Sequence, residues 1–269
     1  MPEGHTVHRL ARDLGELVGR PVSASSPQGR FADGAAQVDG ALLERADAFG
    51  KHLFLVTDAG PAVHVHLGMR GKWLRYDDPA TPPLKQVRLR LASAAVAWDL
   101  IAPSACELLD EAGVRRVVTG LGPDPLRPDA DEAAAVAALA ADRRPIGAAL
   151  LDQAVIAGVG NVFRNEALHA LGVHPEQPGR SVGEDLLVRL WTELRTMMER
   201  GVEDGRIVTV DVPDRLAVPE AEARRVYKQE LCRDCGAPVV TSTVGGRTAY
   251  HCPVEQPARP GDLPSDLGR

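Results

Sequence analysis

The chain has 269 residues, of which 44% are hydrophobic and 4% aromatic, so one large or two medium domains with aliphatic cores are expected. Its formal net charge of −6 excludes a uniformly basic nucleic-acid binder, so any nucleic-acid site must be a local basic surface. No run approaches the ~18 apolar residues of a membrane span, and the N-terminus lacks the apolar segment of a secretory signal. A cytoplasmic protein with no membrane partner is expected.

The chain opens with the segment Pro2-Glu3-Gly4. Removal of Met1 would leave Pro2 with a free secondary amine, and an α-amine titrates near pH ~8, so part of it is nucleophilic at neutral pH. Attack of this amine on an aldehyde carbon gives an iminium, which is a strong electron sink. Glu3 places a carboxylate beside the amine, where it can move protons. A proline in second position is common, however, so this segment alone does not indicate a function.

The first half of the chain is predicted to be mainly strands. Residues 5–18 carry apolar side chains at helical spacing, which predicts one amphipathic helix. After it, short runs separated by glycine and proline predict antiparallel strands. The predicted strands are 41–48, 52–57, 62–67, 72–76, 87–92 and 95–100. Several short strands with turn signals are typical of an antiparallel sandwich or barrel.

Two residues in predicted turns are candidates for a function. Lys51 follows Gly50 at a tight turn, and Met69 lies in a loop between Gly68 and Gly71. A turn lysine is usually only solvated, and a loop methionine usually packs against its neighbours. A methionine between two glycines on a binding face would instead act as a wedge.

The second half is predicted to be mainly helical. Residues 120–131 are rich in glycine and proline and form the predicted linker. Helices are expected at 131–141 and 144–156. A further long helix is expected after the capping-box pattern Ser181-Val182-Gly183-Glu184.

A glycine-rich turn lies between these predicted helices. Gly158 and Gly160 lead directly into a helix that ends near Gly172, with Asn161 as its predicted N-cap. Glycines before a helix N-terminus expose backbone N–H groups, which suit a phosphate. A plain capped turn has the same pattern, so the turn alone is weak support for a binding site.

Three cysteines near the C-terminus do not resemble a disulfide framework. Two residues separate Cys232 from Cys235, and sixteen separate Cys235 from Cys252. This is the spacing of a zinc ribbon, except that Glu255 stands in the fourth cysteine position. Glutamate can ligate zinc, with Zn–O distances of ~2.0–2.2 Å, although the site would then be poorer in thiolate.

The predicted ribbon is a β-hairpin with strands at 241–244 and 248–250, joined at Gly245-Gly246. Arg247 follows this turn, where an arginine is usually only a solvated charge. The remaining residues, 257–269, are rich in Pro, Gly and Asp, which predicts a disordered tail.

Four separated features occur in one order along the chain: Pro2-Glu3-Gly4, the Gly50-Lys51 turn, Gly158-Val159-Gly160-Asn161 and the cysteine ribbon. Together they resemble the formamidopyrimidine-DNA glycosylase / endonuclease VIII family over residues 2–256. The resemblance implies an α+β fold, with an N-terminal antiparallel β-sandwich and flanking helix, a helix-two-turns-helix domain and a zinc-ribbon-like β-hairpin. The expected boundaries are 2–122 for the catalytic domain, 129–226 for the helical domain, 227–256 for the ribbon and 257–269 for the tail.

The resemblance also implies an activity, that of a bifunctional DNA glycosylase and abasic-site lyase in base excision repair. Pro2 would be the Schiff-base nucleophile at the sugar C1′, and Glu3 the acid/base that helps to open the ribose. Lys51 would assist loss of the damaged base. The iminium acidifies the C2′ proton, so β- and then δ-elimination of the strand would follow.

The implied partner is double-stranded DNA with damaged bases or abasic sites, bound between the two domains by a monomeric, nucleoid-associated protein. Asn161 and Arg247 would hold phosphates, and Met69 would fill the gap left by a flipped base. One zinc per chain is implied as cofactor, with ligands Cys232, Cys235, Cys252 and Glu255.

Departures from the family pattern bear on the substrate. Thr6 stands where many members have a glutamate, and residues 99–110 lack the Arg-Phe pair of the purine-directed branch. These features favour the endonuclease VIII branch and oxidised pyrimidines, whereas the run 66–69 is closer to the oxidised-purine branch. Alternatives are an oxidised-purine glycosylase, a DNA-binding repair accessory without catalysis, or an unrelated enzyme with an N-terminal proline base.

Overall fold

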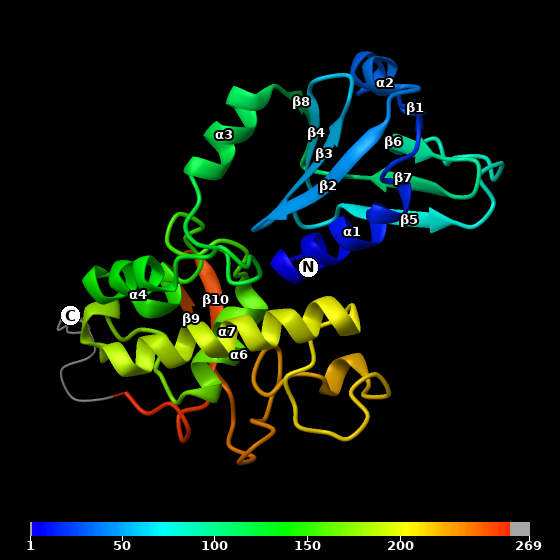
Figure 1. The fold of residues 1–269 in the computed structure, drawn as a ribbon. Coiled ribbons are helices and arrows are strands. Elements are labelled where there is room, and N and C mark those ends of the chain that lie inside the picture. The colour runs from blue at the N-terminus through cyan, green and yellow to red at the C-terminus, as the bar shows by residue number, and fades with distance from the viewer. Residues whose placement is uncertain (1, 259–269) are drawn as a thin grey trace. The chain divides into compact units, whose positions relative to one another are not determined.

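The computed structural model describes residues 2–258 of the chain (Figure 1). The chain divides into two compact units, Met1–Gly120 and Leu121–Arg269, and each unit has its own hydrophobic core. Apart from residues 257 and 258, the predicted disordered tail lies outside the described residues. Within the described part of the chain, no helix is both long and apolar enough to cross a membrane.

Unit 1 contains two four-stranded antiparallel sheets. The first has the strand order β1 (Ser23–Ser25), β6 (Val87–Ala92), β7 (Ala97–Ile101) and β5 (Lys72–Tyr76). The second has the order β2 (Leu43–Phe49), β3 (His52–Thr57), β4 (Ala62–His66) and β8 (Ala105–Leu109). Leu53 and Val63 of one sheet share a core with Leu89 and Leu100 of the other, which confirms the predicted antiparallel sandwich.

Helices flank this sandwich. The amphipathic helix predicted at 5–18 is present as α1 (Gly4–Leu14), continued by the 3₁₀ turn η1 (Gly15–Leu17). Its apolar face places Val7 and Leu14 in the core, and α1 packs on β2 and β3. The short helices α2 (Ala32–Val38) and α3 (Glu111–Thr119) were not predicted, nor were β1 and β8. These elements are short and only partly buried, so their sequences carry little periodicity.

Unit 2 is built mainly from helices and ends in the hairpin. Its helical elements are α4 (Glu132–Ala141), α5 (Ile146–Ala149), α6 (Asn161–Ala170), η2 (Gly179–Ser181), α7 (Glu184–Asp204) and η3 (Glu220–Glu222). The long α7 packs against α4 and α6, and Leu187, Leu190 and Trp191 bury its apolar face. The hairpin consists of β9 (Val240–Val244) and β10 (Arg247–His251), as the ribbon pattern predicts.

The helix predicted at 144–156 is wrong, because only Ile146–Ala149 is helical. Side chains after this point take the place of helical hydrogen bonds. The Asp152 carboxylate accepts from the Ala154 N–H at 3.0 Å. The Gln153 amide donates to the Leu151 and Val159 carbonyl oxygens, both at 3.0 Å. The segment is therefore an ordered irregular loop.

Both predicted helix caps are also wrong. Gly160, not Asn161, is the N-cap residue of α6, and Asn161 is the first helical residue. Gly183 is the N-cap residue of α7 and makes no side-chain cap bond. The Ser181 hydroxyl of the expected capping box instead donates to the Pro178 carbonyl oxygen at 2.8 Å. Asn161 instead bonds to the distant Thr248, and Ser181 to the nearby Pro178, so neither side chain caps its helix.

Candidate functional site

The N-terminal segment ends directly at a helix start. Pro2 precedes Glu3, which is the N-cap residue of α1 and has an extended backbone. The Glu3 carbonyl oxygen accepts from the Thr6 N–H at 3.0 Å, and the residue is only 1% exposed. A carboxylate is favoured at a helix N-terminus by the helix dipole. The structure thus places a buried carboxylate residue beside Pro2.

The lysine turn is a two-residue hairpin connection. Gly50 and Lys51 join β2 to β3, and Phe49 pairs with His52 across the turn. Gly50 has a φ of +56°, which the first central residue of a type II′ turn requires and glycine adopts without strain. In Figure 1 the N-terminal end of α1 and the tip of this hairpin lie at the same end of unit 1. The proposed nucleophile segment and the lysine turn thus belong to one end of one unit.

A histidine network adjoins the lysine turn and was not predicted. His52 Nδ1 and His64 Nε2 share a hydrogen bond of 2.8 Å, and His64 Nδ1 lies 3.0 Å from Glu107 Oε1. Burial lowers the pKa of His52 to about 4, and the positive charges of His66, His64 and Lys51 act in the same direction. His52 is therefore neutral at pH 7. The two-residue period of β4, which brings His64 and His66 to one face, was the available sequence signal.

Met69 is 71% exposed at the tip of the loop between β4 and β5. Two polar contacts hold the base of the loop. His66 Nδ1 and Ser104 Oγ lie 2.7 Å apart, and the Gly68 N–H donates to the same ring nitrogen at 3.1 Å. Gly68 has a φ of +64°, and a Cβ there would lie 2.9 Å from the Ser104 Cβ. An apolar side chain thus stands in solvent on a loop whose base is held by these contacts.

Asn161 lies in a buried polar cluster between α6 and the ribbon. It is 6% exposed, and its Nδ2 donates to the Thr248 carbonyl oxygen at 3.0 Å. The fully buried Arg164 donates to the same oxygen at 2.8 Å, to the Val244 oxygen at 3.0 Å and to Asn161 Oδ1. It also donates to the Gly147 oxygen at 3.2 Å. Arg164 therefore ties α6, α5 and the hairpin together, a role that the sequence did not predict.

Arg247 is the first residue of β10 and is exposed. It pairs with Val244 across the turn Gly245-Gly246, whose φ angles of +61° and +70° fit a type I′ turn. A Cβ at Gly245 would lie 3.0 Å from the Ala148 Cα, so the turn packs closely on α5. The structure therefore presents Arg247 on a hairpin with a fixed turn.

A second buried group on α6 holds the segment before the ribbon. The Glu166 carboxylate is fully buried and accepts from the backbone N–H groups of Arg225, Val226 and Tyr227 at 2.8, 3.0 and 2.7 Å. The Thr209 hydroxyl donates to it as well. Four donors satisfy a carboxylate that burial would otherwise penalise. This residue also went unpredicted, because its partners are far away in the sequence.

The three ribbon cysteines meet as the spacing predicts. Among the described residues, the Sγ atoms of Cys232, Cys235 and Cys252 all lie within 4.8 Å of one another, and the last two are 3.4 Å apart. Tetrahedral zinc with Zn–S bonds of ~2.3 Å separates its sulfurs by about 3.8 Å, so this donor set fits a zinc ion. The carboxylate of Glu255 is outside this cluster, and only its backbone N–H approaches Cys252 Sγ, at 3.5 Å.

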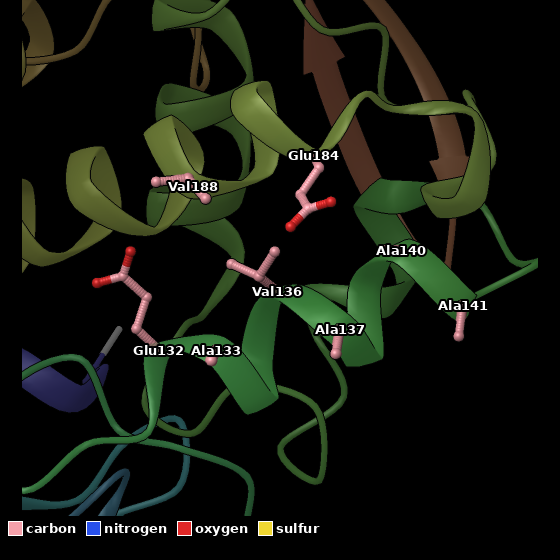
Figure 2. A pocket seen from close by; sticks show the side chains of 8 residues that line it. All are labelled: Glu132, Ala133, Val136, Ala137, Ala140, Ala141, Glu184 and Val188. Carbon is pink, nitrogen blue, oxygen red and sulfur yellow. The ribbon is translucent and has the colours of Figure 1, made fainter.

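A groove of about 670 Å³ between α4 and α7 has a different character (Figure 2). Its walls are alanine and valine side chains, including Val136 and Val188, with the carboxylates of Glu132 and Glu184 beside them. All the residues that line it are apolar or acidic, so it does not suit a phosphate.

Comparisons with known proteins agree with these features. The family model for the formamidopyrimidine-DNA glycosylase N-terminal domain matches residues 1–100, and the model for the H2TH domain of the same glycosylase matches residues 121–212. The Lactococcus lactis Fpg, solved in complex with an abasic site containing DNA, has the same fold. It is 23% identical with a TM-score of 0.78, over 95% of this chain and 100% of that chain.

Two relatives match over almost the whole length. Endonuclease 8 1 of Mycobacterium tuberculosis is 46% identical, in an alignment that covers 95% of this chain and all of that protein. The DNA-(apurinic or apyrimidinic site) lyase Nei2 of Mycolicibacterium smegmatis is 34% identical over 265 residues, or 96% of this chain and all of that protein. With both family domains present in order, the chain belongs to the formamidopyrimidine-DNA glycosylase / endonuclease VIII family, on its endonuclease VIII branch.

Proposed function

We propose that the protein is a bifunctional DNA glycosylase and abasic-site lyase of base excision repair. The observation that carries this proposal is the Pro2-Glu3 pair, with its buried carboxylate residue at the start of α1, at the end of unit 1 that also carries the lysine turn. The likeness to Endonuclease 8 1 and to the lyase Nei2 supports the same activity.

The proposed reaction begins at the Pro2 nitrogen after loss of Met1. This nitrogen forms a bond to the sugar C1′, the bond from C1′ to the base breaks, and Lys51 assists departure of the base. Glu3 donates a proton to the ribose ring oxygen as the ring opens to the iminium. Loss of the C2′ proton then expels the 3′ phosphate, and a second elimination expels the 5′ phosphate. Hydrolysis of the iminium releases the sugar remnant and regenerates the amine.

The proposed partner is duplex DNA that contains a damaged base or an abasic site, bound by a monomer associated with the nucleoid. Asn161 and Arg247 hold phosphates, and the rigidly presented Met69 fills the space of the flipped nucleotide. The fixed positions of Met69 and the hairpin support these roles, because groups that are rigid before binding lose little entropy on binding.

Oxidised pyrimidines are the proposed preferred substrates. Only residues 102–104 separate β7 from β8, and neither this loop nor its neighbours offer the Arg-Phe pair of the purine-directed branch. An oxidised-purine preference is the alternative, favoured by the His66-Leu67-Gly68-Met69 loop. A panel of duplexes with single oxidised bases distinguishes the two by their relative rates of base removal.

The proposed cofactor is one zinc ion per chain, held by Cys232, Cys235, Cys252 and a fourth ligand. When bound, zinc supplies a structural crosslink, because so short a ribbon cannot bury a sufficient core of its own. The chain's own contribution is the set of three clustered sulfurs, together with the α6 contacts that hold the hairpin.

Borohydride trapping on abasic-site DNA tests the proposed function. The expected product is a covalent adduct in which the N-terminal peptide, beginning at Pro2, carries the reduced sugar remnant. An adduct mapped to an internal lysine would contradict the proposed nucleophile. Tight binding with no adduct, from protein whose Met1 has been removed, would instead identify a DNA-binding accessory.

A further inference from the structure

The ribbon is attached to one helix by a continuous series of contacts. Asn161 and Arg164 bond to the hairpin, and Glu166 bonds to the segment before it. One turn further along α6, His169 Nε2 lies 3.3 Å from Cys232 Sγ, and the histidine is only 4% exposed. The imidazole of α6 thus contacts one of the three clustered sulfurs directly.

The other ring nitrogen of His169 faces a carboxylate. Nδ1 makes no hydrogen bond within the described structure, and Asp234 Oδ2 lies 3.9 Å from it. Histidines that ligate zinc commonly donate their second N–H to a carboxylate, which fixes the ring orientation. The ring is therefore placed with Nε2 toward Cys232 Sγ and Nδ1 toward a group that can orient it.

Other candidates for the fourth ligand are less well placed. The Glu255 carboxylate and His169 Nε2 both lie outside the cluster, but only His169 brings a side-chain ligand atom into a described contact with one of its sulfurs, at 3.3 Å from Cys232 Sγ. His251 is next to Cys252 in the chain, but its ring packs edge-on against His174, with the ring centroids 4.6 Å apart. The described structure shows no contact from the His251 ring to a cysteine sulfur.

We infer that His169 Nε2 is the fourth ligand of the zinc ion and replaces the cysteine absent at position 255. This inference rests on the proposed zinc site. Tetrahedral Zn–S and Zn–N bonds of ~2.3 and ~2.0–2.1 Å place the two ligand atoms about 3.6 Å apart, close to the 3.3 Å observed. Nε2 lies outside the 4.8 Å cluster of the three sulfurs, so ligation by His169 would require its ring to move closer to the other sulfurs.

A histidine ligand from α6 changes what the metal crosslinks. Four cysteines would close the ribbon on itself, whereas three cysteines and His169 join the ribbon to the helix that begins with Asn161. Metal loss is then expected to loosen the ribbon from α6 as well as to open the ribbon.

Zinc content and cobalt spectra of the full-length protein test this inference. Variants His169→Ala, His169→Cys and Glu255→Ala are purified without chelator, with wild type and the matched histidine control His174→Gln. We expect about one zinc in wild type, Glu255→Ala and His174→Gln. We expect His169→Ala to lower zinc affinity at least ~10-fold in chelator competition. His169→Cys should keep zinc, and its cobalt form should gain sulfur charge-transfer absorption.

X-ray absorption on wild-type zinc protein needs no variant and should show three sulfur neighbours and one nitrogen. If wild type holds no zinc, the proposed zinc site itself is wrong. If wild type holds zinc but Glu255→Ala loses it while His169→Ala keeps it, the ligand is Glu255 and the inference is overturned. Retention of wild-type affinity by both variants would overturn it in favour of water. Circular dichroism of His169→Ala separates metal loss from misfolding of the helix.

Discussion

Asn161 Nδ2 donates a hydrogen bond of 3.0 Å to the Thr248 carbonyl oxygen, so the first residue of α6 is tied to the second strand of the ribbon. Arg247 is the neighbour of Thr248 in that strand. The two proposed phosphate ligands, which lie far apart in the sequence, are thereby fixed with respect to each other. Arg164 donates to the same Thr248 oxygen and reinforces this link.

Arg164→Met should therefore destabilise unit 2. The change leaves the buried carbonyl oxygens of Gly147 and Val244, and the part-buried oxygen of Thr248, short of donors, which should cost about 2–4 kcal/mol in unfolding free energy. Urea unfolding measures the loss. The exposed Arg195→Met on α7 is the matched control, expected within about 0.5 kcal/mol of wild type. A loss below about 1 kcal/mol for Arg164→Met would show that the hairpin docks without this guanidinium.

Lys51→Ala should separate the two proposed reaction steps. A preformed abasic site has no base to expel, so the variant should lose far more activity on a damaged base than on an abasic site. Pro2→Gly should lose trapping efficiency on both substrates, because the nucleophile itself is altered. Single-turnover cleavage of the two DNA substrates provides the comparison. Equal losses for Lys51→Ala on both would contradict its role in base removal.

The His52 network should make stability depend on pH. The pKa of His52 is lowered to about 4 in the folded protein, against ~6.5 for an unfolded chain. Between these values the unfolded state binds more protons, so the contribution of His52 is complete above pH 6.5 and declines as pH falls toward 4. Because His52 is partly exposed, the unfolding free energy should fall by about 1–3 kcal/mol over this pH range.

His52→Gln tests this pH dependence. The difference in unfolding free energy between wild type and variant should be constant above pH 7. As pH falls to 4, wild type should lose stability relative to the variant. The substitution also removes the hydrogen bond to His64, but that loss is present at every pH. Measurements at closely spaced pH values therefore separate the effect of titration from the effect of the lost bond. A difference independent of pH would mean that His52 is not the titrating group.

Arg247→Ala should reduce the salt dependence of DNA binding. Each phosphate neutralised contributes about −0.9 to the slope of log affinity against log salt, so the variant slope should be shallower by at most ~1. Affinity should fall equally for different sequences, because a phosphate contact carries no base information. Arg195→Ala on α7 serves as a charge-matched control. If the two variants had the same slope, Arg247 would not contact a phosphate.

Much of the fold follows from local pattern. The strand predicted at 52–57 is found as His52–Thr57, and that at 72–76 as Lys72–Tyr76, because apolar spacing and bounding glycines define them. The Gly245-Gly246 turn and the cysteine cluster also follow from residue type and spacing.

Other features depend on partners distant in the sequence. Arg164, Glu166 and His169 look like ordinary residues of an amphipathic helix, and their functions arise only when the ribbon packs on α6. The helix expected at 144–156 fails for a different, local reason, because Asp152 and Gln153 bond to nearby backbone groups. No periodicity reports such contacts.

Glu166 couples the segment before the ribbon to the integrity of α6. The Glu166 carboxylate has backbone partners only while residues 225–227 lie against α6. Their release would leave a buried negative charge without these hydrogen bonds. Release of residues 225–227 alone is therefore costly, and it should coincide with the unfolding of α6. The chain that leads to Arg247 should therefore leave the helical scaffold only when that scaffold itself unfolds.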